Sequence, residues 1–320
     1  TSRLVPMLPM RELARDFGIA LPANTDHVVE TTVAKILSHQ RSDGSFGFWP
    51  DSPDSNAWVT SYALWGLHEA KRRGVAVPQS SLDQSAQWLF RALASEDRGL
   101  RHGVGPFIVY VLAELGKPDP GRVSQLFEGR EGMPLYGKAL LLHAMVLGKH
   151  DPSSIDALVS ELEAAVRIDG PAARTAENQG DAYLAYLDSE ARTSALVLRA
   201  LLAAKPQHPL AARLAIGLLQ DRDGGAWRST QETAWALLAL SDYRRVQETA
   251  VPNFTAGIFF GETLLDQPEF RGRSLETRST IVPTHQLRGA SRTPLGFTVE
   301  GEGRLFYQAR LRYAKRTLPT

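Results

Sequence analysis

The chain of 320 residues contains no cysteine. Disulfide bridges, cysteine-ligated zinc and a cysteine nucleophile are therefore excluded within these residues. An excess of charge of one sign is missing as well, since 36 Lys and Arg stand against 35 Asp and Glu and the formal net charge is +1. This balance gives no reason to expect a nucleic acid or an anionic membrane surface as a partner.

Long hydrophobic runs are also missing. The longest apolar stretch, residues 104–113, is about half of the ~20 residues that a membrane-spanning helix needs, so no direct membrane insertion is expected in this segment. The first residues include neither an initiator Met nor a signal-peptide core, and we expect the chain to be part of something longer. With 43% hydrophobic and 22% charged residues, the composition is that of an ordinary globular protein.

Helical periodicity dominates the first three quarters of the chain. From residue 1 to about residue 251, apolar residues recur at intervals of three and four, as at Tyr62, Ala63 and Leu67. These segments run for about 10–15 residues and end at Gly, Pro, Asn or Asp, with no strand pattern between them. The pattern predicts a mainly α domain of many short helices over residues 1–251.

A repeated segment indicates how these helices are arranged. Residues 40–46 recur as residues 220–227, each with a central Asp-Gly pair, and each copy precedes a related helical pattern at 60–67 and 233–240. We expect each copy to be a turn between two helices, with an aromatic or small side chain pointing inward. Helix pairs that cannot bury their apolar faces alone stack or close into a ring. The repeat therefore predicts an α/α toroid.

After residue 252 the apolar period changes to two. Strands are predicted near residues 254–260, 279–282, 296–299 and 305–313, with a hairpin turn at 301–303 between the last two. A unit of residues 252–320 with about four strands is small, and we expect it to be part of an antiparallel β-sandwich whose other strands lie elsewhere in a parent chain.

No constellation of catalytic residues stands out, and none is assigned. The eight histidines include no pair at metal-binding spacing on one helix face, so no metal and no cofactor are expected. His102 lies in a Gly-rich loop before an apolar helix, where a side chain can approach a reactive group. Ser229 and Glu232 have the spacing of a helix capping box.

The motif Gln40-x-x-x-Gly44-x-Phe46 resembles the repeat of terpene cyclases and prenyltransferase β-subunits, which are also rings of helix pairs. Those enzymes need a carboxylate cluster or a Cys-containing zinc site. This sequence has no Asp-x-Asp-Asp, no Asp-Asp-x-x-Asp and no Cys. The resemblance therefore supports the fold and not the reaction.

A second resemblance covers nearly the whole chain. Several segments are similar to the thioester domain of bacterial α2-macroglobulin-like proteins and, more distantly, of complement, and to the half-sandwich that follows that domain. They are residues 1–8, which resemble the stretch directly after the family's Cys-x-Glu-Gln thioester motif, together with 36–49, 58–62, 224–233, 270–275 and 301–307.

The resemblance implies a protease inhibitor and not an enzyme. In this family, a Cys thiol and a Gln acyl group form an internal thioester that an apolar pocket protects from water, and a nucleophile on a captured protease attacks it after bait cleavage. For this chain it implies target proteases and other macroglobulin domains as partners, and a periplasmic or extracellular, membrane-anchored parent with a role in bacterial defence. Phe48, Trp49, Trp58 and Tyr62 are candidates for the pocket wall, and His102 for a residue that assists transfer.

The thioester Cys and Gln are not in these residues. Either the chain begins just after the motif, which we favour, or the parent belongs to a branch of the family without a thioester. Two other classes stay open on the residues alone. One is an α/α-toroid enzyme of the isoprenoid or polysaccharide-processing kind, and the other is a toroid that binds its partner non-covalently.

Overall fold

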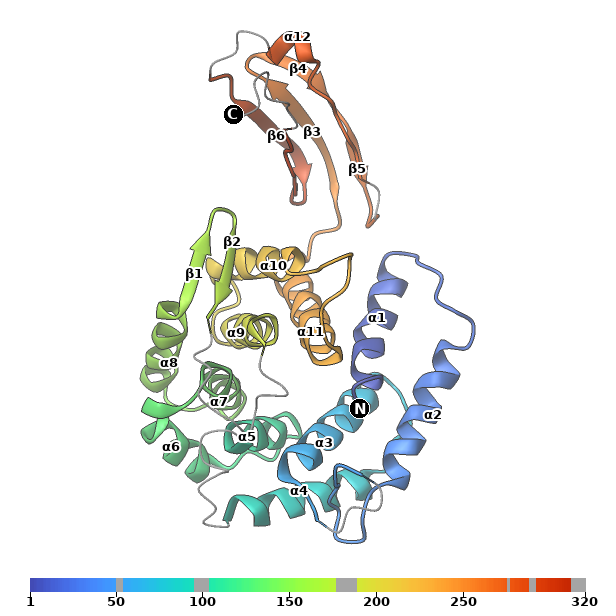
Figure 1. The fold of residues 1–320 in the computed structure, drawn as a ribbon, viewed down its shortest axis with the longest axis vertical. Helices are drawn as coiled ribbons and strands as arrows, with labels where there is room; N and C mark the ends of the chain where they lie inside the picture. The colour runs from blue at the N-terminus through green and yellow to red at the C-terminus, as the bar shows by residue number, and fades with distance from the viewer. Residues whose placement is uncertain (50–53, 95–103, 177–188, 275–276, 288–291, 312–320) are drawn as a thin grey trace, which may run out of the picture. The chain divides into compact units, whose positions relative to one another are not determined.

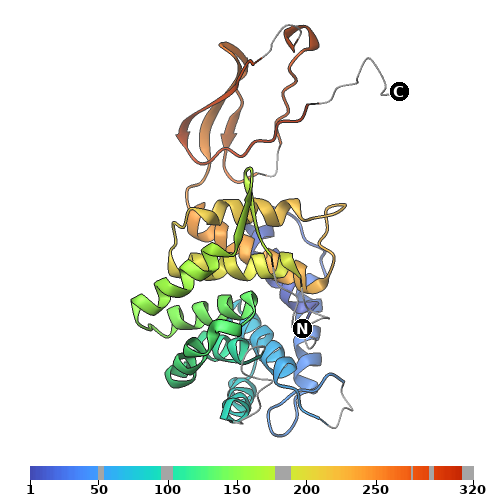
Figure 2. The same cartoon turned by 60° about the vertical axis from the view of Figure 1, so that its left-hand side comes forward.

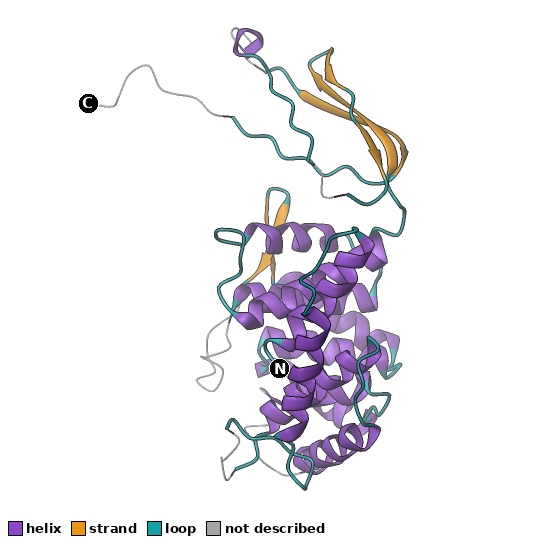
Figure 3. Cartoon of the chain, turned by 90° about the vertical axis from the view of Figure 1, so that its right-hand side faces the viewer, coloured by secondary structure: helices purple, strands orange, loops and turns teal. Residues whose placement is uncertain are grey.

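The structure is a computed structural model that describes residues 1–320 except 50–53, 95–103, 177–188, 275–276, 288–291 and 312–320. The chain divides into two compact units, Thr1–Gln247 and Glu248–Thr320. The first unit is helical apart from one small hairpin, and the second is built on strands (Figure 3).

The elements of the first unit alternate between an inner and an outer layer (Figure 1). The inner helices are α1 (Leu4–Asp16), α3 (Ala57–Arg72), α5 (Gly105–Glu114), α7 (Leu135–Leu147), α9 (Glu190–Ala204) and α11 (Thr230–Gln247). The outer helices are α2 (Thr25–Ser38), α4 (Gln79–Ala94), α6 (Pro120–Glu128), α8 (Pro152–Ala164) and α10 (Leu210–Gln220), with a short 3₁₀ turn η2 (Arg130–Gly132) after α6.

The inner helices close into a ring. Each packs against the next inner helix, and α11 returns to pack against α1. Each outer helix packs against the inner helices on either side of it in sequence, for example α10 against α9 and α11. The predicted α/α toroid is confirmed. Its core is formed by inner-helix side chains that are fully buried, among them Trp65, Ile108 and Leu141.

Local sequence explains where the helices begin. The side chains of Asn56, Asp119, Asp151 and Ser189 accept hydrogen bonds from backbone N–H groups in the first turns of α3, α6, α8 and α9. Proline occupies the first turn of α5, α6 and α8, where its missing N–H costs nothing.

The repeated Asp-Gly segments are turns between an outer and an inner helix, as predicted. Gly44 and Gly224 both have positive φ, +90° and +57°. The first turn is fixed to α4, because Gln40 Nε2 donates to Ser81 O at 2.7 Å and Ser85 Oγ donates to Gly44 O at 2.6 Å. Phe46 points inward and is buried.

The expectation of no strands among the helices was wrong. Strands β1 (Val166–Asp169) and β2 (Ala172–Thr175) form an antiparallel hairpin after α8, visible beside α10 in Figure 2. A Gly170-Pro171 turn with φ +54° at the glycine connects them, and β2 packs on α10 at Gly217, where a Cβ would overlap the backbone of Ala173. The strands are four residues long, too short to show a clear period of two.

The second unit is a small antiparallel sheet around β3 (Asn253–Phe260). On one side β3 pairs with β6 (Leu295–Glu302) over its whole length, from Asn253 opposite Glu302 to Phe260 opposite Leu295. On the other side it pairs with the short strands β4 (Thr263–Asp266) and β5 (Glu269–Arg271), which were not predicted. A four-residue helix, α12 (Thr284–Leu287), lies between β5 and β6.

Three details of the strand prediction were wrong. Residues 279–282 form no strand, and Ile281 is 82% exposed. Residues 301–303 do not make a hairpin turn, because β6 continues to Glu302. Residues 305–311 form no strand either.

Every helix in the described residues is too short or too polar to traverse a lipid bilayer.

Candidate functional site

A pocket lies at one end of the ring and is lined by the starts of the inner helices. Its walls come from α3, α5, α7, α9 and α11, and every lining residue is within the first two turns of its helix. The lining residues are Trp58, Tyr62, Phe107, Tyr136, Leu140, Arg192, Leu196, Gln231 and Trp235, and the cavity between them is small, about 20 Å³. We call this the aromatic pocket, and the end of the ring where it lies the N-terminal mouth.

Stacked rings form one wall of the aromatic pocket and continue into the core. Trp58 stacks on Tyr62 at 5.2 Å between ring centroids, and Tyr62 stacks on Trp65 at 5.9 Å. Trp65 in turn stacks on Trp235 at 4.3 Å, and Phe107 meets both indoles edge-on. Such a wall is rigid and apolar, and it excludes water from whatever lies against it.

Three polar side chains interrupt the apolar lining. Tyr62 is 4% exposed, and its hydroxyl lies within hydrogen-bonding reach of the Ser2 and Gln231 side chains. Burial raises the pKa of the Tyr62 phenol to about 12, so the group keeps its proton at neutral pH. Arg192 is buried with its guanidinium 5.0 Å from the centre of the Tyr136 ring, and Gln231 is buried at the start of α11.

Glu232 joins the helix starts on one side of this mouth. It makes the predicted capping box, in which Glu232 N donates to Ser229 Oγ at 3.1 Å and Arg228 N donates to Glu232 Oε2 at 2.8 Å. Its other oxygen accepts a 2.6 Å hydrogen bond from Ser189, the residue that caps α9 and accepts from Arg192 N. One carboxylate thus fixes α9 against α11 and helps to position Arg192.

The structure brings together two of the residues that the sequence singled out. Trp58 and Tyr62 lie one turn apart on α3 and line the aromatic pocket. Phe48 and Trp49 lie in the loop before α3, are 62% and 75% exposed, and do not line it. His102 lies outside the described residues. Which residues form the wall of a thioester pocket remains a prediction.

Sequence reasoning missed the contributions of α7, α9 and α11 to this pocket. A signal for them exists, since the lining residues of four helices are pairs spaced by four, at the second and sixth positions of α3, α7 and α11 and at the third and seventh of α9. The pairs are Trp58 with Tyr62, Tyr136 with Leu140, Arg192 with Leu196, and Gln231 with Trp235. A side chain four residues along lies on the same helix face, so this pattern marks the face that each helix turns to the mouth.

Farther along the same inner helices lies a buried ion network, which we define as Glu69, Arg72, Arg73, Tyr110, Glu114, Arg199 and Asp242. On α3, Glu69 is 1% exposed and accepts from Arg72 Nη1 at 2.8 Å and from Arg73 Nη1 at 2.5 Å. Burial on its own would raise the pKa of Glu69, but Arg73 and Arg72 outweigh it, and the pKa lies below its ordinary value.

Arg199 of α9 holds the centre of the network. Its Nε donates to Asp242 Oδ2 at 2.7 Å and its Nη1 donates to Tyr110 Oη at 3.0 Å, while Tyr110 donates to Glu114 at 2.9 Å. Burial alone would raise the pKa of Asp242, but Arg199 and Arg245 hold it below its ordinary value. The network therefore ties α3, α5, α9 and α11 together through charge-assisted hydrogen bonds.

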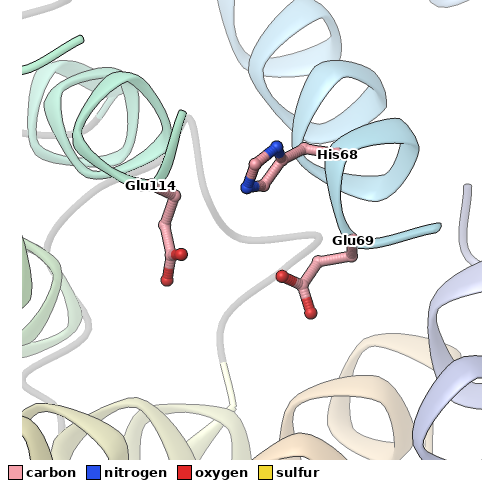
Figure 4. A group of neighbouring side chains, drawn as sticks. All are labelled: His68, Glu69 and Glu114. Atoms are coloured by element: carbon pink, nitrogen blue, oxygen red, sulfur yellow. The ribbon is translucent and has the colours of Figure 1, made fainter. Parts of the chain in front are cut away.

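His68, Glu69 and Glu114 have the geometry of a metal-binding group, with one ligand atom of each within 4.8 Å of the others (Figure 4). Both oxygens of Glu69 accept from arginines, and Glu114 accepts from Tyr110 and lies 3.4 Å from Arg72 Nη1. A cation would have to displace these donors. The arrangement favours ion pairing.

His143 of α7 borders the ion network and makes the fold acid-sensitive. Its ring packs on Tyr110 at 5.0 Å, and burial, reinforced by Arg199, lowers its pKa to about 3. Between that value and the ordinary 6.5, the unfolded chain binds a proton that the folded chain does not. We expect His143 to lower the free energy of unfolding by about 2 kcal/mol from pH 6.5 to pH 4.5, and the lowered pKa of Glu69 to add a smaller loss toward pH 4.5.

Urea denaturation of the variant His143→Phe at both pH values tests this expectation. The phenyl ring keeps the packing on Tyr110 and removes the titration, so most of the loss between pH 6.5 and pH 4.5 should disappear. Burial also lowers the pKa of His68, so a small part of the pH-dependent loss of stability should remain in this variant. His27→Gln, on the exposed face of α2, is the control and should keep the profile of the parent chain. If the free energy of unfolding of His143→Phe fell with pH as it does in the parent chain, His143 would not be the source of the acid sensitivity.

Comparison with known proteins shows what this chain is similar to. A family model described as the A-macroglobulin TED domain matches residues 15–100. An α2-macroglobulin homolog from Nostoc sp. is 24% identical over 322 residues, which cover 98% of this chain and 17% of the relative. The chain is α2-macroglobulin-like.

Solved structures of bacterial α2-macroglobulins share the fold. Salmonella α2-macroglobulin reacted with methylamine superposes with a TM-score of 0.64 at 20% identity, over 85% of this chain and 17% of that one. Escherichia coli α2-macroglobulin activated by porcine elastase superposes with a TM-score of 0.63 at 21% identity, over 94% of this chain and 26% of that one. This α2-macroglobulin-like chain spans about a sixth of the length of the curated relatives that it matches.

Proposed function

We propose that this α2-macroglobulin-like chain is the reactive-domain portion of a bacterial broad-spectrum protease inhibitor that captures proteases covalently through an internal thioester. The chain itself contributes no catalytic residue, because the thioester Cys and Gln belong to the segment that precedes residue 1 in the family. Its role is to hold the thioester in a dry, apolar environment until a protease triggers its exposure, since an activated acyl group survives only where water is excluded.

The observation that carries this proposal is the position of residue 1 beside the aromatic pocket. Thr1 lies against α3, where a Cβ on Gly66 would come within 2.6 Å of Thr1 Cγ2. Gly66 follows Tyr62 by one helical turn, and Tyr62 lines the pocket. On this proposal, the reactive segment of the longer protein lies near the N-terminal mouth, beside the stacked rings of Trp58 and Tyr62.

Two of the similar proteins support the same chemistry. Salmonella α2-macroglobulin is described as reacted with methylamine, and the Escherichia coli protein as activated by porcine elastase. Methylamine is a small amine nucleophile of the kind that opens a thioester, and elastase is a protease. Both behaviours fit a protein that holds an acyl group for attack by a protease amine.

The partners and location follow from the same proposal. The partners are target proteases and the other macroglobulin domains of the longer protein, which is periplasmic or extracellular and anchored to a membrane. The toroid and the strand unit divide at residues 251 and 252 in this scheme, and the strand unit completes a sandwich with strands from elsewhere in that protein.

The test is made on the longer protein that carries this chain. It is incubated with trypsin, with and without prior methylamine, and followed by denaturing gels and a free-thiol assay. We expect a covalent trypsin adduct that methylamine abolishes, with one thiol released per chain. The absence of both adduct and thiol would overturn the proposal and favour a toroid that works by non-covalent binding.

A further inference from the structure

Three Asp-Gly pairs occur in the sequence, and the structure describes all of them. They are Asp43-Gly44, Asp169-Gly170 and Asp223-Gly224, and the three glycines lie in turns with φ of +90°, +54° and +57°. In such a pair the backbone nitrogen of the glycine can attack the carboxyl carbon of the aspartate, because the glycine has no side chain to hinder the approach. Whether the reaction occurs depends on how firmly the fold holds these two groups.

Asp223-Gly224 is the least restrained of the three pairs. Both residues are exposed, and among the described residues the Asp223 carboxylate accepts no hydrogen bond and forms no ion pair. Gly224 N likewise donates to no group in the described part of the chain. A Cβ on Gly224 or on Gly225 would meet nothing within 4 Å, so the turn has room to move. The turn is held by two backbone hydrogen bonds between Asp223 and Ala226, 2.9 and 3.1 Å long.

Asp43-Gly44 has the same two residues in the opposite surroundings. Asp43 Oδ1 accepts hydrogen bonds from Ser45 N at 2.9 Å and from Ser45 Oγ at 2.6 Å. Gly44 N donates to Arg41 O at 2.9 Å, and Gly44 is buried against α4. Burial on its own would raise the pKa of Asp43, but the hydrogen bonds from Ser45 outweigh it and hold the pKa below its ordinary value. Both reacting groups of this pair are therefore engaged.

Asp169-Gly170 is intermediate between the other two pairs. Both residues are exposed, but Asp169 ends β1 and pairs with Ala172 in the ladder with β2. Gly170 O accepts a 2.7 Å hydrogen bond from Arg213 on α10. To bring the glycine nitrogen to the carboxyl carbon, the peptide has to rotate against both restraints.

We infer that Asp223-Gly224 is a site of spontaneous modification, at which the aspartate converts to isoaspartate. This inference is independent of the proposed function. Gly224 N attacks Asp223 Cγ and a C–N bond forms. The amide proton and the hydroxyl of the neutral carboxyl leave as water, so a five-membered succinimide results. Water then adds to the carbonyl carbon of the original peptide bond and breaks its C–N bond. One water leaves and one enters, so mass and net charge are unchanged.

The product changes the junction between an outer and an inner helix. In isoaspartate the main chain runs through the side chain, which adds one carbon to it, and a carboxylate is left on Cα. The two hydrogen bonds between Asp223 and Ala226 depend on the ordinary spacing of this turn. The turn lies between α10 and the capping box of Ser229 and Glu232 at the start of α11. The modification therefore loosens the connection that leads into that cap.

The test incubates the longer protein that carries this chain in warm neutral buffer for several weeks. Peptides that contain each Asp-Gly pair are then separated by chromatography, and isoaspartate is identified by electron-transfer fragmentation in a mass spectrometer. We expect isoaspartate at Asp223 to exceed that at Asp43 by about 10–100-fold, because three hydrogen bonds have to open at Asp43 before the ring can close. Asp169 should lie between them. Comparable amounts at Asp223 and Asp43, or more at Asp43, would overturn the inference.

Incubation in guanidinium chloride separates the effect of the fold from that of the sequence. In the unfolded chain all three pairs should form isoaspartate at similar rates. If the denatured sample formed isoaspartate at Asp223 and the native sample formed none, the turn would protect this pair and the inference would be wrong. Asp223→Glu is the matched control, because it keeps the charge but would need a less readily formed six-membered ring. Its peptide should show no isomerised form, and an isomerised form in this variant would place the reaction at another residue.

Discussion

Replacing Arg199 by methionine should lower the free energy of unfolding of the helical unit by about 3–5 kcal/mol. Arg199 is 6% exposed, and its guanidinium bonds to Asp242 on α11 and Tyr110 on α5. Methionine fills much of the space but leaves the Asp242 carboxylate and the Tyr110 hydroxyl without this donor in a poorly hydrated place. The measurement is urea denaturation followed by circular dichroism.

Two further variants show whether the loss comes from charge left unpaired. Lys205→Met removes an exposed cation from the end of the same helix, where it pairs with Asp156 at 2.9 Å, and should leave stability unchanged within error. Adding Asp242→Asn to Arg199→Met should recover part of the loss, because it removes the carboxylate that Arg199 had neutralised. A loss below 1 kcal/mol in Arg199→Met would show that the network contributes little to holding the ring closed.

The toroid could be predicted because its signals are local. The apolar spacing of each helix and the two Asp-Gly turns lie within short windows of sequence, and the repeat shows that helix pairs recur. The buried ion network could not be predicted in the same way. Glu69, Glu114, Arg199 and Asp242 are far apart in sequence and resemble surface charges until the ring brings their helices together. Only the tertiary fold shows that they are paired.

The pocket illustrates the same limit on a smaller scale. Trp58 and Tyr62 could be found because they follow a recognisable turn, and the aromatic pair is conspicuous in the sequence. Arg192 and Gln231 are ordinary polar residues at helix starts, where solvent exposure is the usual expectation. The N-terminal mouth buries both, because five helices begin at one place and shield each other's first turns. Phe48 and Trp49, equally conspicuous, lie in the loop before α3 and are exposed.

The two copies of the repeat allow a paired experiment with the second large expected effect. Gly44 and Gly224 occupy the same place in the two Asp-Gly turns, and both have φ in the left-handed region, +90° and +57°. A side chain at either position is strained, because Cβ approaches the backbone carbonyl there. The surroundings differ. A Cβ on Gly44 would overlap the backbone carbonyl of Gln84 on α4, whereas a Cβ on Gly224 meets nothing within 4 Å.

Gly44→Ala should therefore cost about 3–4 kcal/mol of unfolding free energy, and Gly224→Ala about 1 kcal/mol. Both variants carry the backbone strain of a left-handed alanine. Gly44→Ala loses more stability because its Cβ also forces the turn away from α4. The shift also strains the bonds from Gln40 to Ser81 and from Ser85 to Gly44 O, which fix the turn. Urea denaturation of both variants in parallel gives the comparison.

The informative quantity is the difference in unfolding free energy between the two variants, because the strain of a left-handed alanine is common to both and cancels. Equal losses would mean that the first turn adapts without leaving α4, and that its close approach does not determine how the outer layer packs. A difference of about 2 kcal/mol or more would show that Gly44 is required for that approach. Phe46 in this turn donates from its N to Thr60 Oγ1 and accepts from Asn56 N at the start of α3, so the same contact then helps to set where Trp58 and Tyr62 enter the N-terminal mouth.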